Sequence, residues 1–358
     1  ITGGYDDEQR QQLLKLKGEY GIRILGPNTI MGVINTANGL NTTFERDVMP
    51  ERGSISVISQ SGGVGACLLD WACFYRIGIS KFAFMGDKID INDVDLLKYL
   101  NEDHETKVIC LYMEGIENGR EFIQVAKKVV ATKPILVLKG GVTKEAARRA
   151  LSHTASMAGS DIVFDAALKK AGIIRVEDGE ELINSAVALA KQPPLHGDNI
   201  AIVSNVGGPA ILAADAVVRN GLKLAVLSEK TKKEIERRYP GMEAVNPIDL
   251  IADARADRYS VTLDLVLSDP NVDGVMVINM LKSCFFEPED ALAIAKSAEK
   301  HAEKPVVNVA AGGEDFTFVH NVLQSTSIPV YNLPEKAARA LRALRIYHKI
   351  TKKHLSAT

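Results

Sequence analysis

The sequence is poor in aromatic residues, which make up 6% of its 358 residues and include a single tryptophan. Single-stranded nucleic acid is usually bound by stacking bases on aromatic side chains, so this scarcity argues against that class of protein. An excess of charge of either sign is also missing, because 43 basic and 45 acidic side chains leave a formal net charge of −2. The net charge therefore excludes electrostatic attraction to nucleic acid or to an anionic membrane as the main basis of its function.

Long hydrophobic runs and patterned cysteines are missing as well. No apolar run reaches the roughly 18 residues that a membrane-spanning helix needs, and the N-terminus has no basic-then-apolar signal pattern. The four cysteines are scattered without metal-ligand spacing, at Cys67, Cys73, Cys110 and Cys284. These features indicate reduced thiols in a cytoplasmic protein, with neither a membrane nor nucleic acid as partner and no metal site of its own.

Strands and helices are expected to alternate along the chain. Runs rich in β-branched residues, such as Ile55–Ser59 and Val108–Tyr112, are each followed by a helix-like stretch. Similar runs occur at Ile135–Leu138, Ile200–Val203, Gly274–Ile278 and Val306–Val309. Continuous apolar runs are typical of buried parallel strands, so the pattern predicts an α/β protein with doubly wound parallel sheets. Between the halves, the Pro-Pro and Gly of Lys191–Gly197 predict a linker.

The two halves of the chain resemble each other. Ile55–Asp70 matches Ile200–Asp215 at a constant offset of 145 residues. Further on, Lys133-Pro134 with Gly140-Gly141 pairs with Lys304-Pro305 and Gly312-Gly313. The repeat predicts two tandem flavodoxin-like domains, at residues 26–192 and 198–350, followed by a tail at 351–358.

The first residues do not fit either repeat. Ile1–Gly4 looks like the end of a strand that enters a helix at Asp6–Tyr20, and a further strand is predicted at Ile22–Leu25. These elements are too few for a sheet of their own. We therefore expect residues 1–25 to be the remnant of an N-terminal domain.

One segment of the first half has no counterpart in the second half. Gly141 and Ile173 are separated by 31 residues, whereas the equivalent Gly313 and Ile328 are separated by 14. The extra residues lie within Arg148–Asp161. Because the sister half does without them, the sheet does not need this segment, and its small, specific residues favour a function over plain disorder.

Both repeats contain a strand that leads through two glycines into a helix. The helix starts are Ser61-Gly62-Gly63-Val64 in the first half and Gly207-Gly208 in the second. The first N–H groups of a helix lack intrahelical partners, and glycine allows an anion to approach them, so each start suits a phosphate. Neither is a Walker loop or a complete dinucleotide fingerprint. The alternative is a tight turn whose glycines serve packing.

The extra segment contains His153, among small and polar neighbours. A neutral imidazole on a loop can accept a phosphoryl group, and helix N-termini would stabilise the transferred dianion. A structural or solvated histidine is the alternative. Metal ligation is less favoured because no second His or Cys lies at ligand spacing.

Glu114 follows the strand that ends at Met113, at the sheet edge where α/β proteins place their sites. The repeat aligns it with Met280, so a carboxylate occurs only in the half that carries His153. Such a carboxylate could orient the imidazole and raise its nucleophilicity. A solvated glutamate at a strand end is the alternative. Asn28 and Gly86 also lie at polar strand exits and rank lower, and Arg339–Lys353 is typical of a solvated amphipathic helix.

In combination, these motifs closely resemble the α subunit of ADP-forming acyl-CoA synthetases, relatives of succinyl-CoA synthetase. The elements that carry the resemblance are Gly26-Pro-Asn28, Ser59-Gln-Ser-Gly-Gly63, Tyr112-Met-Glu-Gly115, Lys139-Gly-Gly141, Ser152-His-Thr154 with Ala158-Gly-Ser-Asp161, and Ser204-Asn-Val-Gly-Gly-Pro209 leading to Asn246-Pro-Ile-Asp249. The match runs from about Ile22 to Ile350.

The resemblance implies a phosphoryl relay in an ADP-forming acid–CoA ligase. Acyl-CoA and phosphate would give an acyl phosphate, whose phosphoryl group passes to His153, positioned by Glu114 and held by the two helix starts, and then to ADP. CoA would bind mainly to a Rossmann-like N-terminal domain, of which residues 1–25 would be the remnant. ATP or ADP and Mg²⁺ would bind mainly to ATP-grasp domains, in a β subunit of a hetero-oligomer or in fused sequence.

The sequence departs from its relatives near the acyl site. Thr29 stands where many relatives have a small residue such as Cys, and Asp87 follows Gly86 where they often have Asn. We expect Asn28, Thr29 and Gly86 to contact the substrate or CoA, and larger or hydroxylated short carboxylic acids to be possible substrates. The alternative function is a non-catalytic acyl-CoA sensor fused to an acetyltransferase, which would not need His153 and Glu114. A flavodoxin-like nucleotide binder is a weaker third interpretation, because a Ser/Thr-rich flavin phosphate loop is missing.

Overall fold

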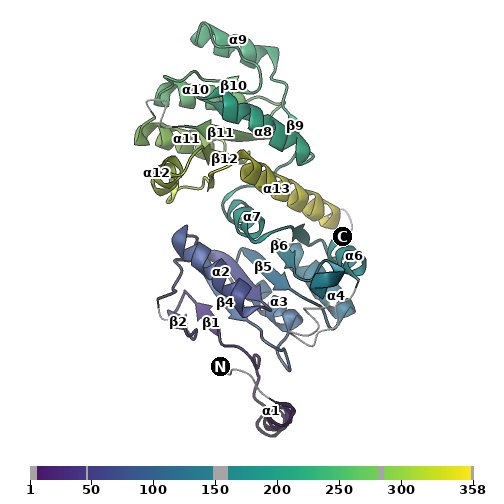
Figure 1. Ribbon diagram of the computed structural model, residues 1–358. Helices are drawn as coiled ribbons and strands as arrows, with labels where there is room; N and C mark the ends of the chain where they lie inside the picture. Colours follow the sequence, from purple (N-terminus) through teal and green to yellow (C-terminus); the bar gives the residue numbers. More distant parts are fainter. Residues whose placement is uncertain (1–5, 46, 148–159, 281–285, 356–358) are drawn as a thin grey trace. The chain divides into compact units, whose positions relative to one another are not determined.

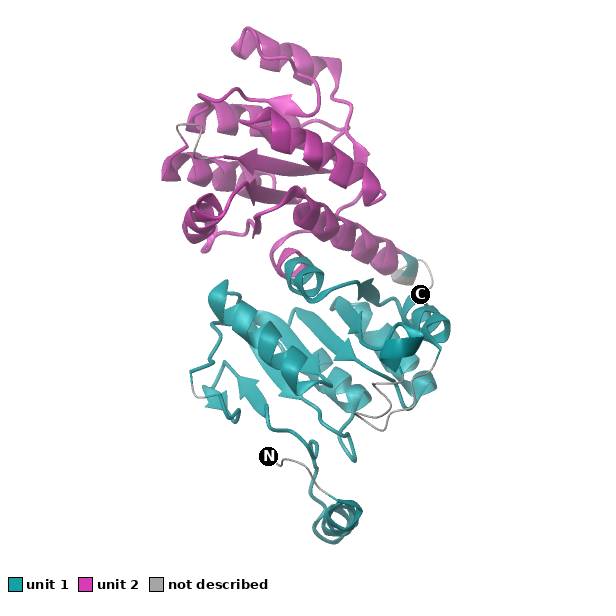
Figure 2. Cartoon of the chain, viewed as in Figure 1, with its two compact units in different colours: residues 1–186, 353–358 teal, residues 187–352 magenta. Residues whose placement is uncertain are grey.

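The computed structural model describes residues 6–45, 47–147, 160–280 and 286–355 (Figure 1). The chain forms two compact units, of which unit 1 comprises residues 1–186 and 353–358 and unit 2 comprises residues 187–352 (Figure 2). Each unit has its own sheet with helices on both faces, as the alternating pattern predicted. Among the described helices, none combines the length and the apolar character that crossing a bilayer requires.

Unit 1 is built on a seven-stranded sheet in the order β2-β1-β4-β3-β5-β6-β7. Its strands are β1 Val33–Asn35, β2 Leu40–Asn41, β3 Arg52–Ser59, β4 Ile79–Phe84, β5 Val108–Met113, β6 Ile135–Lys139 and β7 Ile174–Val176. Its helices are α1 Asp7–Tyr20, α2 Gly62–Phe74, α3 Asp93–Glu102, α4 Gly119–Val130, α6 Asp161–Ala171 and α7 Gly179–Lys191, the last of which continues into unit 2. The pairs from β4 to β7 are parallel, and the short pair β2–β1 adds an antiparallel edge that the sequence analysis did not predict.

Unit 2 contains a second sheet, in the order β10-β8-β11-β12-β13, with β9 also paired to β8. Its strands are β8 Asn199–Ser204, β9 Lys223–Leu224, β10 Ile248–Asp249, β11 Gly274–Asn279, β12 Val306–Ala310 and β13 Val330–Tyr331. Its helices are α8 Gly207–Arg219, α9 Glu229–Arg238, α10 Ala256–Leu267, α11 Pro288–Lys300, α12 Glu314–Leu323 and α13 Pro334–Leu355.

The central strands β8, β11 and β12 of unit 2 are buried on both faces, as is typical of continuous apolar runs. Successive side chains of a strand point to opposite faces, and the core divides accordingly. Ala201 and Val203 of β8 pack in one apolar cluster with residues of α10, α11 and α12. Ile200 and Ile202 pack in a second cluster with residues of α8 and α13.

The parallel strands follow the same order in both units. In unit 1 the order is β4-β3-β5-β6-β7, and in unit 2 β10 with β9 takes the place of β4 beside the first strand. Numbered along each repeat, this is the order 2-1-3-4-5 of flavodoxin-like folds. The predicted fold class of two flavodoxin-like α/β repeats is therefore confirmed.

Asn246 bridges the gap between β9 and β10. Its amide nitrogen donates to the carbonyl oxygens of Ile200 and Ala225, at 2.9 and 3.0 Å, and its side-chain oxygen accepts from the N–H of Ile202 at 2.9 Å. Because β9 ends at Leu224 and β10 begins at Ile248, strand backbone is missing beside this part of β8. One side chain thus supplies the donor and acceptor that the strand does not.

Three local expectations differ from the structure. Ile22–Leu25 is not a strand, because this segment has only scattered bonds, such as Ile91 N–H to Ile24 O at 3.0 Å, and no ladder. The units divide at 186/187, so the predicted linker at 191–197 lies within unit 2, where Leu195 is buried and Gln192 accepts from Val306 N–H at 2.7 Å. Helix α13 continues to Leu355, past the predicted start of a tail, because no Gly or Pro stops it.

Candidate active site

The first strand of each unit ends in the same turn. In unit 1, the Ser59 hydroxyl donates to the carbonyl oxygen of Ser61 at 2.6 Å and accepts from its N–H at 3.2 Å. In unit 2, Ser204 makes the same two bonds with Val206, at 2.7 and 3.1 Å. The hydroxyl thus fixes the turn from which α2 or α8 begins.

Three of the four glycines that begin α2 and α8 are not explained by packing. A Cβ atom at Gly63, Gly207 or Gly208 would have no described atom within 4 Å, and none of the three has a positive φ. Gly62 differs, because its Cβ would lie 3.3 Å from the Phe84 ring. Open space over helix N–H groups favours close approach of an anion over the packing alternative.

The two helix starts are capped differently. Ser61 is the N-cap of α2, and its side chain accepts from the N–H of Val64 at 3.4 Å. Val206 is the N-cap of α8 and offers no side-chain acceptor. The start of α8 therefore has more N–H donors left for a ligand. Each start belongs to its own unit.

Glu114 is buried at the carboxyl end of β5, directly beside the start of α2. The side-chain oxygen of Gln60 accepts from the N–H groups of Glu114 and, at 3.3 Å, Gly115. The Tyr112 hydroxyl donates to Glu114 Oε1 at 3.3 Å. Burial and the Glu114 carboxylate together raise the pKa of Tyr112 to about 12, so the phenol keeps its proton and remains a donor. The Glu114 side chain is therefore buried and bonded to Tyr112, and it is not a solvated residue at a strand end.

Unit 2 has the same hydrogen bond to the backbone at the end of β11, but Met280 takes the place of the charged glutamate. Asn205 takes the place of Gln60, and its side-chain oxygen accepts from the N–H of Met280 at 3.1 Å. The predicted equivalence of Glu114 and Met280 is therefore visible in the hydrogen bonds of the two strand exits.

Asn28, Thr29 and Gly86 lie together in unit 1. Asn28 has a left-handed backbone, with φ of 58°, and Thr29 is buried against Gly26. A side chain at Gly86 would collide with the carbonyl oxygen of Pro27, so the two loops touch through their backbones. The N–H of Asp87 donates to the same oxygen at 3.0 Å.

This loop pair lies beside the start of α2. A Cβ atom at Gly62 would be 3.5 Å from Cγ of Met31, which belongs to the segment after Thr29. Unit 1 therefore brings three groups of expected site residues to the carboxyl ends of its strands: the Asn28 loop, Ser61–Val64 and Glu114. His153 lies outside the described residues.

The sequence analysis missed three residues as members of this site. Gln60 and Tyr112 hold Glu114, and Lys139 is buried at the end of β6. All three belong to motifs that carried the family resemblance. An ionisable residue at the carboxyl end of a buried strand was the available signal for Lys139.

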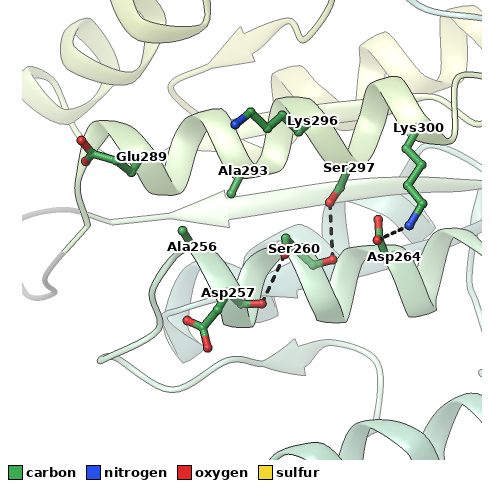
Figure 3. Close-up of a pocket in the computed structure, with 9 residues that line it drawn as sticks. All are labelled: Ala256, Asp257, Ser260, Asp264, Glu289, Ala293, Lys296, Ser297 and Lys300. Carbon is green, nitrogen blue, oxygen red and sulfur yellow. Dashed lines mark hydrogen bonds and ion pairs between the residues drawn. The ribbon is translucent and has the colours of Figure 1, made fainter.

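A cavity of about 450 Å³ lies between α10 and α11 of unit 2 (Figure 3). Lys300 and Asp264 form an ion pair across it at 2.5 Å, and the Ser297 hydroxyl donates to Ser260 O at 3.4 Å. None of the expected site residues lines it. Among the described residues, no group of three or more His, Cys, Asp or Glu side chains is arranged to hold a metal ion.

Comparison with known proteins shows to which family this chain belongs. Residues 52–189 match the succinyl-CoA ligase like flavodoxin domain, and residues 200–348 match the Ligase-CoA domain. The α subunit of acetate–CoA ligase (ADP-forming) II from Pyrococcus furiosus is 39% identical over 96% of this chain and 75% of its own length. The chain belongs to the family of ADP-forming acid–CoA ligases.

Other members of this ligase family are similar over nearly the whole chain. The 4-hydroxybutyrate–CoA ligase (ADP-forming) of Nitrosopumilus maritimus is 36% identical over 96% of this chain, which spans 50% of that protein. The dinucleotide forming acetyl-coenzyme A synthetase 1 of Ca. Korarchaeum cryptofilum, solved in complex with phosphate and ADP, has a TM-score of 0.89 and 32% identity. That match covers 99% of this chain and 78% of the synthetase. The predicted resemblance and the enzyme class, an acid–thiol ligase, are thereby confirmed.

Proposed function

We propose that this ligase chain relays a phosphoryl group through His153 while acid, CoA and ATP interconvert with acyl-CoA, ADP and phosphate. In the direction of ATP formation, a phosphate oxygen attacks the thioester carbon and the CoA thiolate leaves. The imidazole nitrogen of His153 then attacks phosphorus, and the carboxylate leaves. Finally a terminal oxygen of ADP takes the phosphoryl group, and the phosphorus–nitrogen bond breaks.

The geometry of Glu114 carries this proposal. The carboxylate accepts from the Tyr112 hydroxyl and the backbone N–H of Glu114 donates to Gln60, at a strand exit beside an open helix start in the unit that contains His153. A carboxylate that accepts from one imidazole nitrogen fixes the tautomer in which the other nitrogen is nucleophilic. Unit 2 has Met280 in the equivalent position, so the shared fold does not require this carboxylate.

The remaining expected residues take roles around this pair. The helix starts at Ser61–Val64 and at Gly207-Gly208 would hold the phosphoryl oxygens through their N–H groups. Asn28, Thr29 and Gly86 would contact a short carboxylic acid or CoA. Relatives named for acetate and for 4-hydroxybutyrate support short acids as substrates.

ADP or ATP with Mg²⁺ would bind ATP-grasp domains outside this chain, in a β subunit or in fused sequence. The name of one relative as a subunit alpha supports a hetero-oligomer. The free thiols of Cys67, Cys73 and Cys110 support a cytoplasmic location.

The proposal can be tested with acyl phosphates. The protein is mixed with a panel of short-chain acyl phosphates, and mass spectrometry is used to find phosphate that is labile in acid and stable in alkali. We expect phosphate on His153 and none in His153→Ala, with the fold retained. The most efficient donor would identify the acyl group that the site prefers.

A matched control is His104→Ala, because His104 is an exposed histidine of the same unit and should leave the phosphorylation unchanged. Absence of phosphohistidine with every donor, in the full-length protein as well as in this chain, would contradict the relay. That result would favour the acyl-CoA sensor instead.

A further inference from the structure

Lys139 is a buried cation for which the described part of the chain provides no direct ion pair. It is 7% exposed, and its ammonium donates to the carbonyl oxygen of Gly140 and lies 5.2 Å from the centre of the Phe164 ring. An ammonium has three N–H donors, and within the described chain it has no carboxylate at ion-pair distance. Burying a cation without a close counter-ion is costly, so an anion at this position would be stabilised.

The electrostatic surroundings of Lys139 are those of the candidate site. Burial lowers the pKa of Lys139, while the charges of Asp161 and Glu114 act to raise it and that of Arg175 to lower it. Arg175 is itself paired with Asp161 at 2.8 Å. Lys139 is therefore near enough to Glu114 for their charges to interact but does not form a closed ion pair with it.

The sister unit shows that the fold does not need this lysine. Lys139 pairs with Met113 across β5 and β6, and Ala310 pairs with Asn279 across β11 and β12. The backbone bonds after these residues agree, because Gly140 N–H donates to Met113 O at 2.9 Å and Ala311 N–H to Asn279 O at 3.0 Å. Lys139 therefore corresponds to Ala310.

Another lysine of the same strand region behaves differently. Lys133 donates to the carbonyl oxygen of Asp103 at 2.7 Å, and Lys304 of unit 2 donates to that of Asp269 at the same distance. This structural lysine is present in both units. Lys139, like Glu114, is present only in the unit that carries His153.

We propose that Lys139 binds the phosphoryl group during its transfer, as the cationic contact at the carboxyl ends of β5 and β6. That the anion is a phosphoryl group rests on the proposed function, whereas the capacity to bind phosphate does not. A phosphate dianion beside Glu114 would be repelled by the carboxylate, and the ammonium offsets this repulsion. Lys139 gives up no proton and forms no covalent bond in this role.

The test uses inorganic phosphate as the probe. Melting temperatures are measured over a phosphate titration at constant ionic strength, with chloride as the balancing anion. We expect phosphate to raise the melting temperature of the wild-type protein and of His153→Ala. In Lys139→Met the apparent affinity should fall at least tenfold, and Lys139→Arg should retain most of it.

Two further variants make the test independent of folding defects. Lys139→Ala has the side chain that unit 2 has at Ala310, so it should fold and also lose the phosphate response. Lys133→Met should lower the melting temperature without phosphate but keep the phosphate-dependent rise. An unchanged phosphate response in Lys139→Met or Lys139→Ala, or no response in the wild-type protein, would overturn the proposal.

The phosphoryl relay through His153 and the role of Lys139 can be contradicted independently of each other. Loss of phosphohistidine with every acyl phosphate, together with a phosphate response that depends on Lys139, would remove the relay and keep the anion site. Labelling of His153 with a phosphate response that Lys139→Met does not change would keep the relay and remove this role of Lys139.

Discussion

The two units share a fold and differ in charge at the same strand ends. Both order their parallel strands in the same way, and both fix the first strand exit with a serine hydroxyl. Unit 1 has Glu114 and Lys139 where unit 2 has Met280 and Ala310. The charged residues of the proposed site thus occupy positions that the flavodoxin-like fold leaves free to vary, and the unit without them serves as an internal reference.

The units also differ in the strand beside the first one. In unit 1, β4 pairs with β3 along its whole length, apart from an irregularity near Ile55. In unit 2 the corresponding place is divided between β9 and β10 and is completed by Asn246. The core of the sheet therefore tolerates an interrupted strand as long as the hydrogen bonds of its neighbour are satisfied.

The largest effect is expected from removing the negative charge at the end of β5 in unit 1, because unit 2 has the uncharged Met280 in the equivalent position. Glu114→Gln keeps the shape and removes the charge that would orient His153, so phosphorylation by acyl phosphate should slow by about 10²-fold or more. The rate is measured by quenched-flow with labelled donor. Glu121→Gln, which changes a partly exposed glutamate paired with Lys98, is the control and should keep the wild-type rate. An unchanged rate in Glu114→Gln would exclude the carboxylate from the transfer.

A smaller effect is expected from breaking the bridge in unit 2. Asn246→Ala leaves the buried N–H of Ile202 without its acceptor, which should cost about 2 kcal/mol in the free energy of unfolding of this unit. The loss is measured by urea denaturation. Asn271→Ala removes one exposed amide contact, to Val226 O at 3.0 Å, and should cost clearly less. Equal losses in the two variants would mean that Asn246 does not replace strand backbone.

The smallest effect on stability is expected in the segment that precedes the first strand of each unit. In unit 1, burial acts to raise the pKa of Asp90, but bonds from Lys17, Ile24 N–H and Arg23 outweigh it and lower the pKa to about 2. Since the unfolded value is about 3.9, this contact stabilises the segment fully above that pH and is lost as pH falls toward 2. In unit 2 the lead-in is held by the neutral amide of Gln192 instead.

Hydrogen exchange at Ile24 measures this difference, because its N–H donates to Asp90 Oδ2 at 2.8 Å. Protection should be constant from pH 7 to 5 and fall between pH 4 and 2, by about 1 kcal/mol because Lys17 and Arg23 are partly exposed. Asp90→Asn should abolish the pH dependence, and protection at Val306, which is bound to Gln192, should not fall in this range. A pH-independent protection of Ile24 would contradict the role of Asp90.

The repeat made most of the fold predictable from the sequence. Buried strands such as β5 and β11 were visible as apolar runs, and the offset of 145 residues located both helix starts. The prediction was wrong at Ile22–Leu25, where an apolar run has no neighbouring strand to pair with. Pairing Gly140-Gly141 with Gly312-Gly313 was out by one residue, because the strand register aligns Lys139 with Ala310 and hence Gly141 with Gly312.

The candidate site was predictable only where the two repeats disagree. Glu114 could be singled out because its partner in the repeat is Met280. Gln60 and Tyr112 could not be assigned, because their role depends on hydrogen bonds that the sequence does not show: Gln60 accepts from the backbone N–H of Glu114 on the neighbouring strand, and the Tyr112 hydroxyl donates to the Glu114 carboxylate. Lys139 was overlooked although its place at the end of a predicted strand was an available signal, and its burial, which separates it from an ordinary lysine, is visible only in the structure.

The amide bridge at Asn246 has a practical consequence for engineering. Because the chain leaves the sheet at Ala225 and re-enters it at Ile248, the intervening residues, with α9, form an excursion whose ends are tied to β8 and to each other. Ile235, Met242 and Ala244 of this excursion pack in the core of unit 2, so foreign sequence is best accepted at its exposed turn, at Gly241. A fluorescent label or an affinity tag placed at Gly241 would report on unit 2 without changing any residue of unit 1.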